Sequence, residues 1–195
     1  MIHDLDKTLE ELLKSELPPD LISPGSGTAV TISFATPDKD FSVKPAINLF
    51  LYDVRENLEL RNTTWSTERS NGRATKRRNP VRVDCSYLIT AWSALTGTGN
   101  GQRPEQEEHQ WLGEVMKVLL RHRMIPAAVL QGNLRGMEPP IRTVSLSQSN
   151  LQSLGEFWQA MGGKPRPALN YTLTMAVEVD DPVDAGTLVT DMRIG

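Results

Sequence analysis

The sequence predicts an α+β fold, in which a mainly antiparallel sheet carries about three packed helices. Two observations indicate this class. Some stretches repeat apolar residues at the three-to-four spacing of a helix, while others alternate or continue apolar residues as strands do, with several connections of hairpin length. In addition, the chain has 195 residues and a net charge of −3, which fits one compact globular domain. We expect this single domain to cover residues 1–180 and residues 181–195 to form a C-terminal arm.

The first half of the chain begins with a predicted amphipathic helix over residues 3–17, which a pair of prolines ends. A half-buried strand follows at residues 30–34, where apolar side chains alternate with polar ones. Residues 47–52 are apolar on both faces, which predicts a central strand that is covered from both sides. Residues 55–80 show no sustained periodicity, and a connection of that length is either functional or disordered.

The second half begins with a predicted strand at residues 81–93. This strand and the central strand flank the long excursion, and we expect the two to form an extended hairpin. A helix is expected from Pro104 to about Arg121, with glutamates in its first turn and basic residues in its last. A third helix is expected over about residues 150–161, with Leu154 among its inward residues, and a glycine pair as its stop. The clearest strand pattern covers residues 171–179.

Residues that could carry catalysis or hold a metal are scattered. The three histidines form no pair at ligand spacing, and Cys85 has no cysteine companion, which leaves it as a buried structural thiol. No G-x-S-x-G motif is present, and the glycine-rich stretches do not continue into phosphate-binding motifs. Glu107 and Glu108 are interpreted as first-turn helix charges. We therefore predict no catalytic residue, no metal and no cofactor.

The sequence contains no run of about 18 apolar residues and no apolar region of a signal peptide near its start. This predicts a chain without a membrane span that is cytoplasmic when it is made and assembled.

The charge distribution singles out one segment. Residues 61–82 contain seven cations and one acid, a net charge of +6, which leaves −9 for the rest of the chain. Three interpretations stay open: a solvated loop, a surface that docks another protein, and a nucleic-acid site. The absence of interleaved aromatic residues and the negative remainder of the chain weigh against nucleic acid. The candidate partner-binding residues are Trp65, Arg69, Arg73, Lys76, Arg77, Arg78 and Arg82.

Five stretches go beyond such patterns: "ISFATPDKDF", "PAINLFLYDVRENLELRN", "NPVRVDCSYLITAWS", "EEHQWLGEVMKVLL" and "LGEFWQAMGGKPRPALNYTLTMAVEV". In this order they resemble the cap, or tail-terminator, proteins of phage-tail-like extracellular contractile injection systems. The resemblance runs from about residue 2 to residue 179. It rests above all on the combination of "LFLYDVREN", "YLITAWS" and the final stretch.

The resemblance implies a structural protein that is not an enzyme. Such a protein forms a six-subunit ring, ends polymerisation of the inner tube and sheath, and ties their last rings together, so its expected partners are copies of itself, the tube protein and the sheath protein. The sequence stops soon after residue 179, which leaves open whether it forms the outermost cap alone or works with a second, longer paralogue. It does not distinguish a particle that is released from one held at a membrane.

A strand at a sheet edge, or the arm after Asp181, is a second expected means of binding sheath or tube, by strand addition. The alternatives to a cap are another structural adaptor and a nucleic-acid-binding module that uses the basic loop 69–82.

Overall fold

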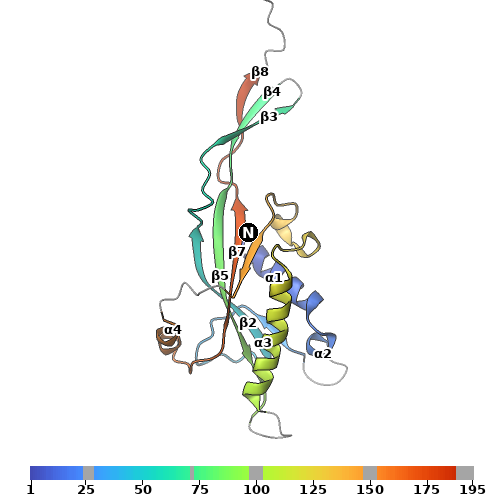
Figure 1. Cartoon of the computed structure of the whole chain (residues 1–195), viewed down its shortest axis with the longest axis vertical. Coiled ribbons are helices and arrows are strands. Elements are labelled where there is room, and N and C mark those ends of the chain that lie inside the picture. Colours follow the sequence, from blue (N-terminus) through green and yellow to red (C-terminus); the bar gives the residue numbers. More distant parts are fainter. Residues whose placement is uncertain (24–28, 71–72, 97–102, 147–152, 188–195) are drawn as a thin grey trace, which may run out of the picture.

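The computed structural model describes residues 1–23, 29–70, 73–96, 103–146 and 153–187. The molecule is elongated: helices pack on a five-stranded sheet to form a body, and a three-stranded sheet projects from one end of it (Figure 1). We call these the body sheet and the projecting sheet. The C-terminal strand β8 belongs to the projecting sheet, far from the helices (Figure 1).

The body sheet has the strand order β1-β2-β5-β7-β6. Its strands are β1 (Thr31–Ser33), β2 (Ala46–Glu56), β5 (Val81–Trp92), β6 (Arg142–Ser145) and β7 (Leu169–Val177). Only β1 and β2 pair in parallel, and the other neighbours in this sheet are antiparallel. The prediction of a mainly antiparallel α+β fold is thereby confirmed.

Strands β2 and β5 form the long hairpin that the sequence predicted on either side of the excursion. Their register runs from Ala46 opposite Trp92 to Glu56 opposite Val83, with an irregularity between Leu51 and Asp53. β2 lies between β1 and β5, so it is the central strand that its continuous apolar run predicts.

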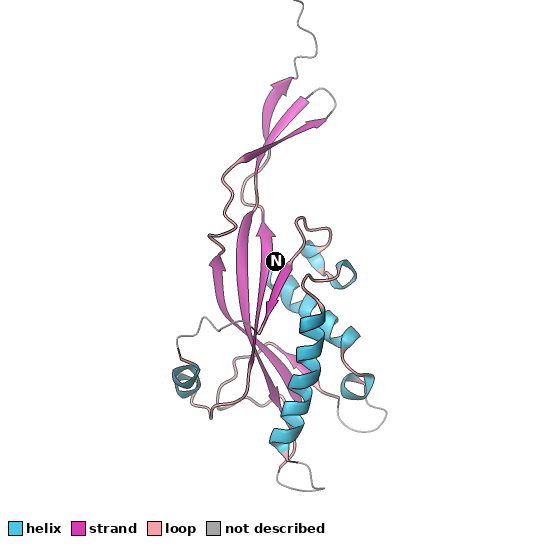
Figure 2. Ribbon diagram, viewed as in Figure 1, coloured by secondary structure: helices cyan, strands magenta, loops and turns pink. Residues whose placement is uncertain are grey.

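One face of the body sheet is covered by helices α1 (Ile2–Glu16) and α3 (Pro104–Arg121), with the short α2 (Pro19–Ile22) beside them (Figure 2). Each long helix turns an apolar stripe inward because its apolar residues recur every three to four positions. These stripes pack on inward residues of β2, β5 and β7 in one buried cluster. Two 3-10 turns, η2 (Ala127–Val129) and η3 (Gly132–Leu134), lead from α3 toward β6.

The opposite face is covered by α4 (Leu154–Ala160), which is shorter than the sequence indicates. Trp158 packs there with Phe41, Leu88 and Trp92 in a second buried cluster. The expectation that the central strand is covered on both sides is therefore confirmed. Leu154 is exposed, contrary to the prediction that it points inward, because it lies at the first turn of the helix, away from the sheet. Residues 150–152 of the predicted helix lie outside the described part.

The excursion 55–80 is mostly neither loop nor disorder. It contains β3 (Trp65–Ser70) and β4 (Arg73–Arg78), which pair antiparallel, and the tail supplies β8 (Val183–Thr187) to the other edge of β4. The periodicity was missing because the described side chains of this sheet, Ala74 apart, form no buried face along which apolar residues would have to alternate. Val179 is also exposed, since β7 ends at Val177.

Candidate partner-binding surface

The projecting sheet carries most of the basic segment, and its register decides which side chains share a face. Trp65 lies opposite Arg78, Thr67 opposite Lys76, and Lys76 opposite Val183. Because side chains alternate along a strand and paired residues point the same way, these five residues lie on one face. We call it the Trp65 face.

The Trp65 face exposes apolar groups that a protein normally covers. Trp65 is 46% exposed and Val183 is 55% exposed. Both line a shallow groove of about 280 Å³ together with Lys76, which forms no ion pair within the described residues. The Arg78 guanidinium lies 5.1 Å from the centre of the Trp65 ring, in a cation–π contact. An exposed aromatic ring with an aliphatic neighbour and two cations is typical of a protein-docking surface.

The opposite face of the projecting sheet turns Arg77 toward the body. Its guanidinium forms an ion pair with Glu178. Arg78, although it lies on the Trp65 face, is 3.6 Å from the Asp180 carboxylate. Glu178 and Asp180 follow β7 directly, so these pairs connect the projecting sheet to the end of the body sheet. Two of the candidate partner-binding cations thus face carboxylates of their own chain.

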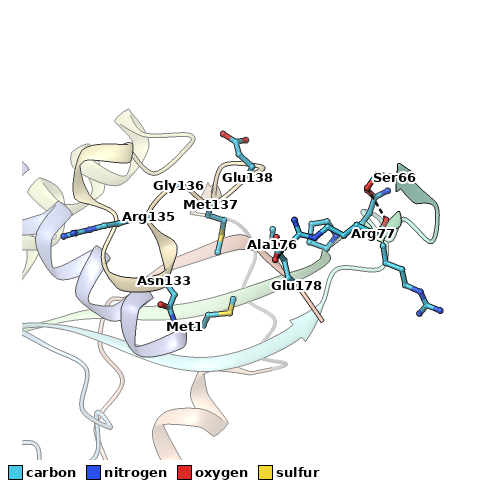
Figure 3. Close-up of a pocket in the computed structure, with 13 residues that line it drawn as sticks. Met1, Ser66, Arg77, Asn133, Arg135, Gly136, Met137, Glu138, Ala176 and Glu178 are labelled. Atoms are coloured by element: carbon cyan, nitrogen blue, oxygen red, sulfur yellow. Dashed lines mark hydrogen bonds and ion pairs between the residues drawn. The ribbon is translucent and has the colours of Figure 1, made fainter. Parts of the chain in front are cut away.

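A cleft of about 590 Å³ lies at this junction. Figure 3 shows Met1 and Met137 on its body side and Ser66 and Arg77 on the side of the projecting sheet. The Ser66 hydroxyl donates a hydrogen bond of 3.1 Å to the Arg77 carbonyl, which fixes β3 to β4 there. The lining mixes thioethers, amides and charges, an arrangement suited to contact with a peptide segment.

Both sheets have edge strands that another chain can extend. β3 and β8 border the projecting sheet, while β1 and β6 border the body sheet. The N–H and C=O groups along the outer side of such a strand are the groups used in strand addition. β8 itself shows that the tail after Asp181 is able to form a strand, since it pairs with β4.

The remaining predicted residues are placed differently. Arg69 and Arg73 lie in β3 and β4, but their side chains are outside the described part. Arg82 is not on the projecting sheet: it belongs to β5 and is only 8% exposed. Burial lowers the pKa of its guanidinium, and the nearby charge of Arg142 adds to that effect. The basic segment is therefore divided between a projecting surface and the body.

Sequence reasoning missed the residues that complete these surfaces, namely Glu178, Asp180, Val183 and Arg142. Each is distant in sequence from the basic segment, and single charged or apolar residues at strand ends carry no local signal. Only the pairing of β8 with β4 and of β6 with β7 brings them into place.

Groups that could perform chemistry are used structurally. Burial raises the pKa of the Cys85 thiol to about 11, so it stays protonated, and the Tyr87 hydroxyl donates a hydrogen bond of 2.7 Å to Asp6. Glu108 is buried rather than a simple first-turn charge, because it accepts bonds from the Ser93 backbone and from Arg166. Among the described residues, no group of three or more His, Cys, Asp or Glu side chains could hold a metal ion. Helices in the same residues are all too short or too polar to cross a bilayer.

The covered body and the exposed Trp65 face together suit a protein that binds other proteins. The chain belongs to the family described as the Pvc16 N-terminal domain, whose sequence profile matches residues 4–191. This confirms the resemblance inferred from the sequence motifs. No curated protein matches the chain.

Two solved structures are similar over 100% of this chain, each with 27% sequence identity and a TM-score of 0.69. One is the sheath/tube terminator, in the extended state, of PVC, an extracellular contractile injection system, and the other is the tube-terminating cap of the anti-feeding prophage, AFP. The chain spans 62% and 61% of their lengths, about three fifths. Both are named as terminators or caps, in agreement with the prediction of a structural protein.

Proposed function

We propose that this chain is a cap that ends growth of the inner tube and sheath of an extracellular contractile injection particle and joins their last rings. The observation that carries the proposal is the similarity, over the whole chain, to two proteins named as terminators of such structures. The elongated shape supports it: a body with its own core bears a projecting sheet that reaches beyond it (Figure 1).

The cap acts as a ring of six subunits, as the family resemblance implies. A closed ring uses the same head-to-tail contact at every interface, so each subunit must present two different, complementary surfaces. A stable contact of this kind buries about 800 Å² on each partner. The projecting sheet and the body provide two such separate surfaces on one chain.

The Trp65 face is the contact that we assign to a tube, sheath or neighbouring cap subunit. Trp65 and Val183 supply the apolar centre, and Lys76 and Arg78 supply charges at its rim. Strand addition at the β3 edge would place a partner strand directly beside this face.

Electron microscopy of particles assembled without this chain tests the terminator role. Sheaths and tubes of uncontrolled length, or tubes detached from their sheaths, are the expected result. Restoring the chain in trans must then restore uniform length. Particles of normal length and intact tube–sheath attachment in its absence would overturn the proposal.

The docking role of the basic strand is tested separately by the double reversal Arg77→Glu with Arg78→Glu. We expect loss of cap attachment to particles in a sedimentation assay, because Arg78 on the Trp65 face and Arg77 on the opposite face of the same strand both become acids. The matched control adds Glu178→Arg and Asp180→Arg to the double reversal, which restores both ion pairs within the chain in the opposite order. If attachment needs only these internal pairs, the control attaches normally; if a partner binds the two cations, it does not.

A further inference from the structure

A second pocket, separate from the Trp65 face, lies where β5 begins in the body sheet. It has a volume of about 310 Å³. Two arginines contribute to its lining, Arg82 from β5 and Arg142 from β6. Apolar residues from three connecting segments complete it, and these are Leu60, Pro80 and Pro139.

Arg82 is a buried cation that forms no ion pair with any other described residue. It is 8% exposed, its Nε is shut off from solvent, and that atom has no hydrogen-bond partner in the described part of the chain. A buried charge is normally paired and hydrogen-bonded, because removing it from water is costly. The unsatisfied Nε of Arg82 therefore marks a site that the described part of the chain does not complete.

Asp84 attracts Arg82 electrostatically, but no ion pair between the two is formed in the described residues. Asp84 lies two positions along β5, but its Oδ2 accepts a bond of 2.9 Å from Asn57, and its Oδ1 accepts one of 2.6 Å from Thr174. No ion pair joins Asp84 to either arginine in the described residues. The carboxylate is held instead by neutral donors that fix the strand ends.

Arg142 increases the positive charge instead of balancing it. It pairs with Thr174 of β7, which in turn lies opposite Asp84, so the pleat brings Arg142 to the same face as Arg82. Arg142 is exposed and forms no ion pair within the described residues. The two guanidiniums thus converge on the pocket, with no acidic residue among those that line it.

We propose that this pocket binds the carboxylate of a glutamate or aspartate side chain presented by a neighbouring protein subunit. Two guanidiniums match a carboxylate in charge and geometry. The amide oxygen of Asn62 bonds to Thr64, which leaves its amide nitrogen as a further donor on the pocket wall. Leu60, Pro80 and Pro139 form an apolar rim that suits the methylene stem of an acidic side chain, whereas a free phosphate has no apolar part to place there.

The inference rests on the proposed function only for the identity of the neighbour, a subunit of the injection particle. It otherwise assigns a carboxylate-binding site to the isolated chain. The contacts proposed for the Trp65 face and the strand edges do not depend on this site.

Nuclear magnetic resonance of the isolated chain tests the site, with the Arg side-chain Nε–Hε signals as the probe. A blocked tripeptide Ala-Glu-Ala is titrated in, in parallel with Ala-Gln-Ala and with inorganic phosphate. We expect a saturable shift of the Arg82 signal with the glutamate peptide. The affinity for the glutamine peptide and for phosphate should be at least about tenfold weaker. No saturable shift, or equal binding of the glutamine peptide or of phosphate, overturns the inference.

Two variants assign the binding to this pocket. Arg142→Gln removes the exposed cation and should weaken glutamate-peptide binding by about tenfold or more, since a charge-assisted hydrogen bond is lost. Arg123→Gln changes a comparably exposed arginine that does not line the pocket and should leave binding unchanged. Unchanged binding in Arg142→Gln overturns the assignment, and because Arg142 is exposed, the test does not depend on a variant of buried Arg82 that could fail to fold.

The same measurements separate this inference from the terminator proposal. If the isolated chain ignores the glutamate peptide while particles lacking the chain lose length control, the pocket inference falls and the terminator role stands. If the peptide binds but particles form normally without the chain, the terminator role falls and the pocket inference stands.

Discussion

The body sheet and the projecting sheet of this chain are stabilised in different ways. Both faces of the body sheet are apolar and covered, with Leu49 buried against α1 and α3 and Leu88 buried on the side of α4. In the projecting sheet, Ala74 is the one buried side chain among those described. Backbone pairing and exposed ion pairs hold the projecting sheet, and its largest apolar side chain faces solvent. The body folds around its own core, while the projecting sheet presents a surface for a partner.

The largest expected effect separates the two regions by core truncation. Leu49→Ala in β2 should lower the free energy of unfolding by about 2–5 kcal/mol, because it removes a fully buried side chain and leaves a cavity. Urea unfolding followed by circular dichroism measures the change. Val183→Ala is the control in the projecting sheet, since that valine is 55% exposed, and it should shift stability by no more than about 0.5 kcal/mol. Equal effects of the two would contradict the division proposed.

The second prediction uses Cys85 to report how firmly the body sheet is closed. Burial raises the pKa of the thiol to about 11, against an ordinary value of 9.0, so the reactive thiolate is about 100-fold scarcer near pH 8 than in the unfolded chain. We expect iodoacetamide to label the native protein slowly and the urea-unfolded protein quickly, as mass spectrometry will show. Rapid native labelling would mean that the body sheet opens readily.

The same raised pKa gives a pH dependence with a defined sign. The folded state favours the protonated thiol, so this contribution to stability is present below about pH 9 and is lost as pH rises toward 11. Burial and the hydrogen bond to Asp6 also raise the pKa of Tyr87, which acts in the same direction at alkaline pH. Stability should therefore decline in the alkaline range, and Cys85→Ser should make that decline shallower.

Much of the body could be predicted from the sequence, and the reasons are local. Residues 47–52 are apolar on both faces, and the helix from Pro104 to Arg121 has a proline start and a regular apolar stripe. These signals arise because burial demands apolar residues at fixed spacing. In the projecting sheet, burial imposes no such spacing. The sequence there predicted only a basic segment without a defined structure.

One overlooked signal lay within that basic segment. Asn71-Gly72 is a typical two-residue hairpin turn sequence, and it separates β3 from β4 in the chain. The pocket between Arg82 and Arg142 has no comparable signal. It depends on the pairing of β6 with β7 and of β7 with β5, which connects residues 60 positions apart only after the sheet forms.

The fourth prediction compares one substitution at an ion pair in each region. Glu108→Gln should destabilise the body by about 1–3 kcal/mol, because the Glu108 carboxylate accepts bonds of 2.8 Å from Arg166 and 3.0 Å from the Ser93 backbone in a buried position. Arg166 also lies 4.1 Å from the Trp92 ring, so the loss reaches the second core cluster. Glu178→Gln, at an exposed pair, should change stability by less than about 1 kcal/mol. Urea midpoints of both variants provide the comparison.

The smallest expected effect on stability falls at the residue with the largest expected effect on assembly. Trp65→Ala removes an exposed ring whose contact with Arg78 contributes about 0.5–1 kcal/mol at such a site, so unfolding of the isolated chain should hardly change. Cap attachment to particles should nevertheless be lost, because a large aromatic side chain at the centre of a contact surface commonly dominates its binding energy. Trp65→Phe keeps a ring and should retain partial attachment. Normal attachment of Trp65→Ala would show that the projecting sheet docks through its strand edges instead of this face.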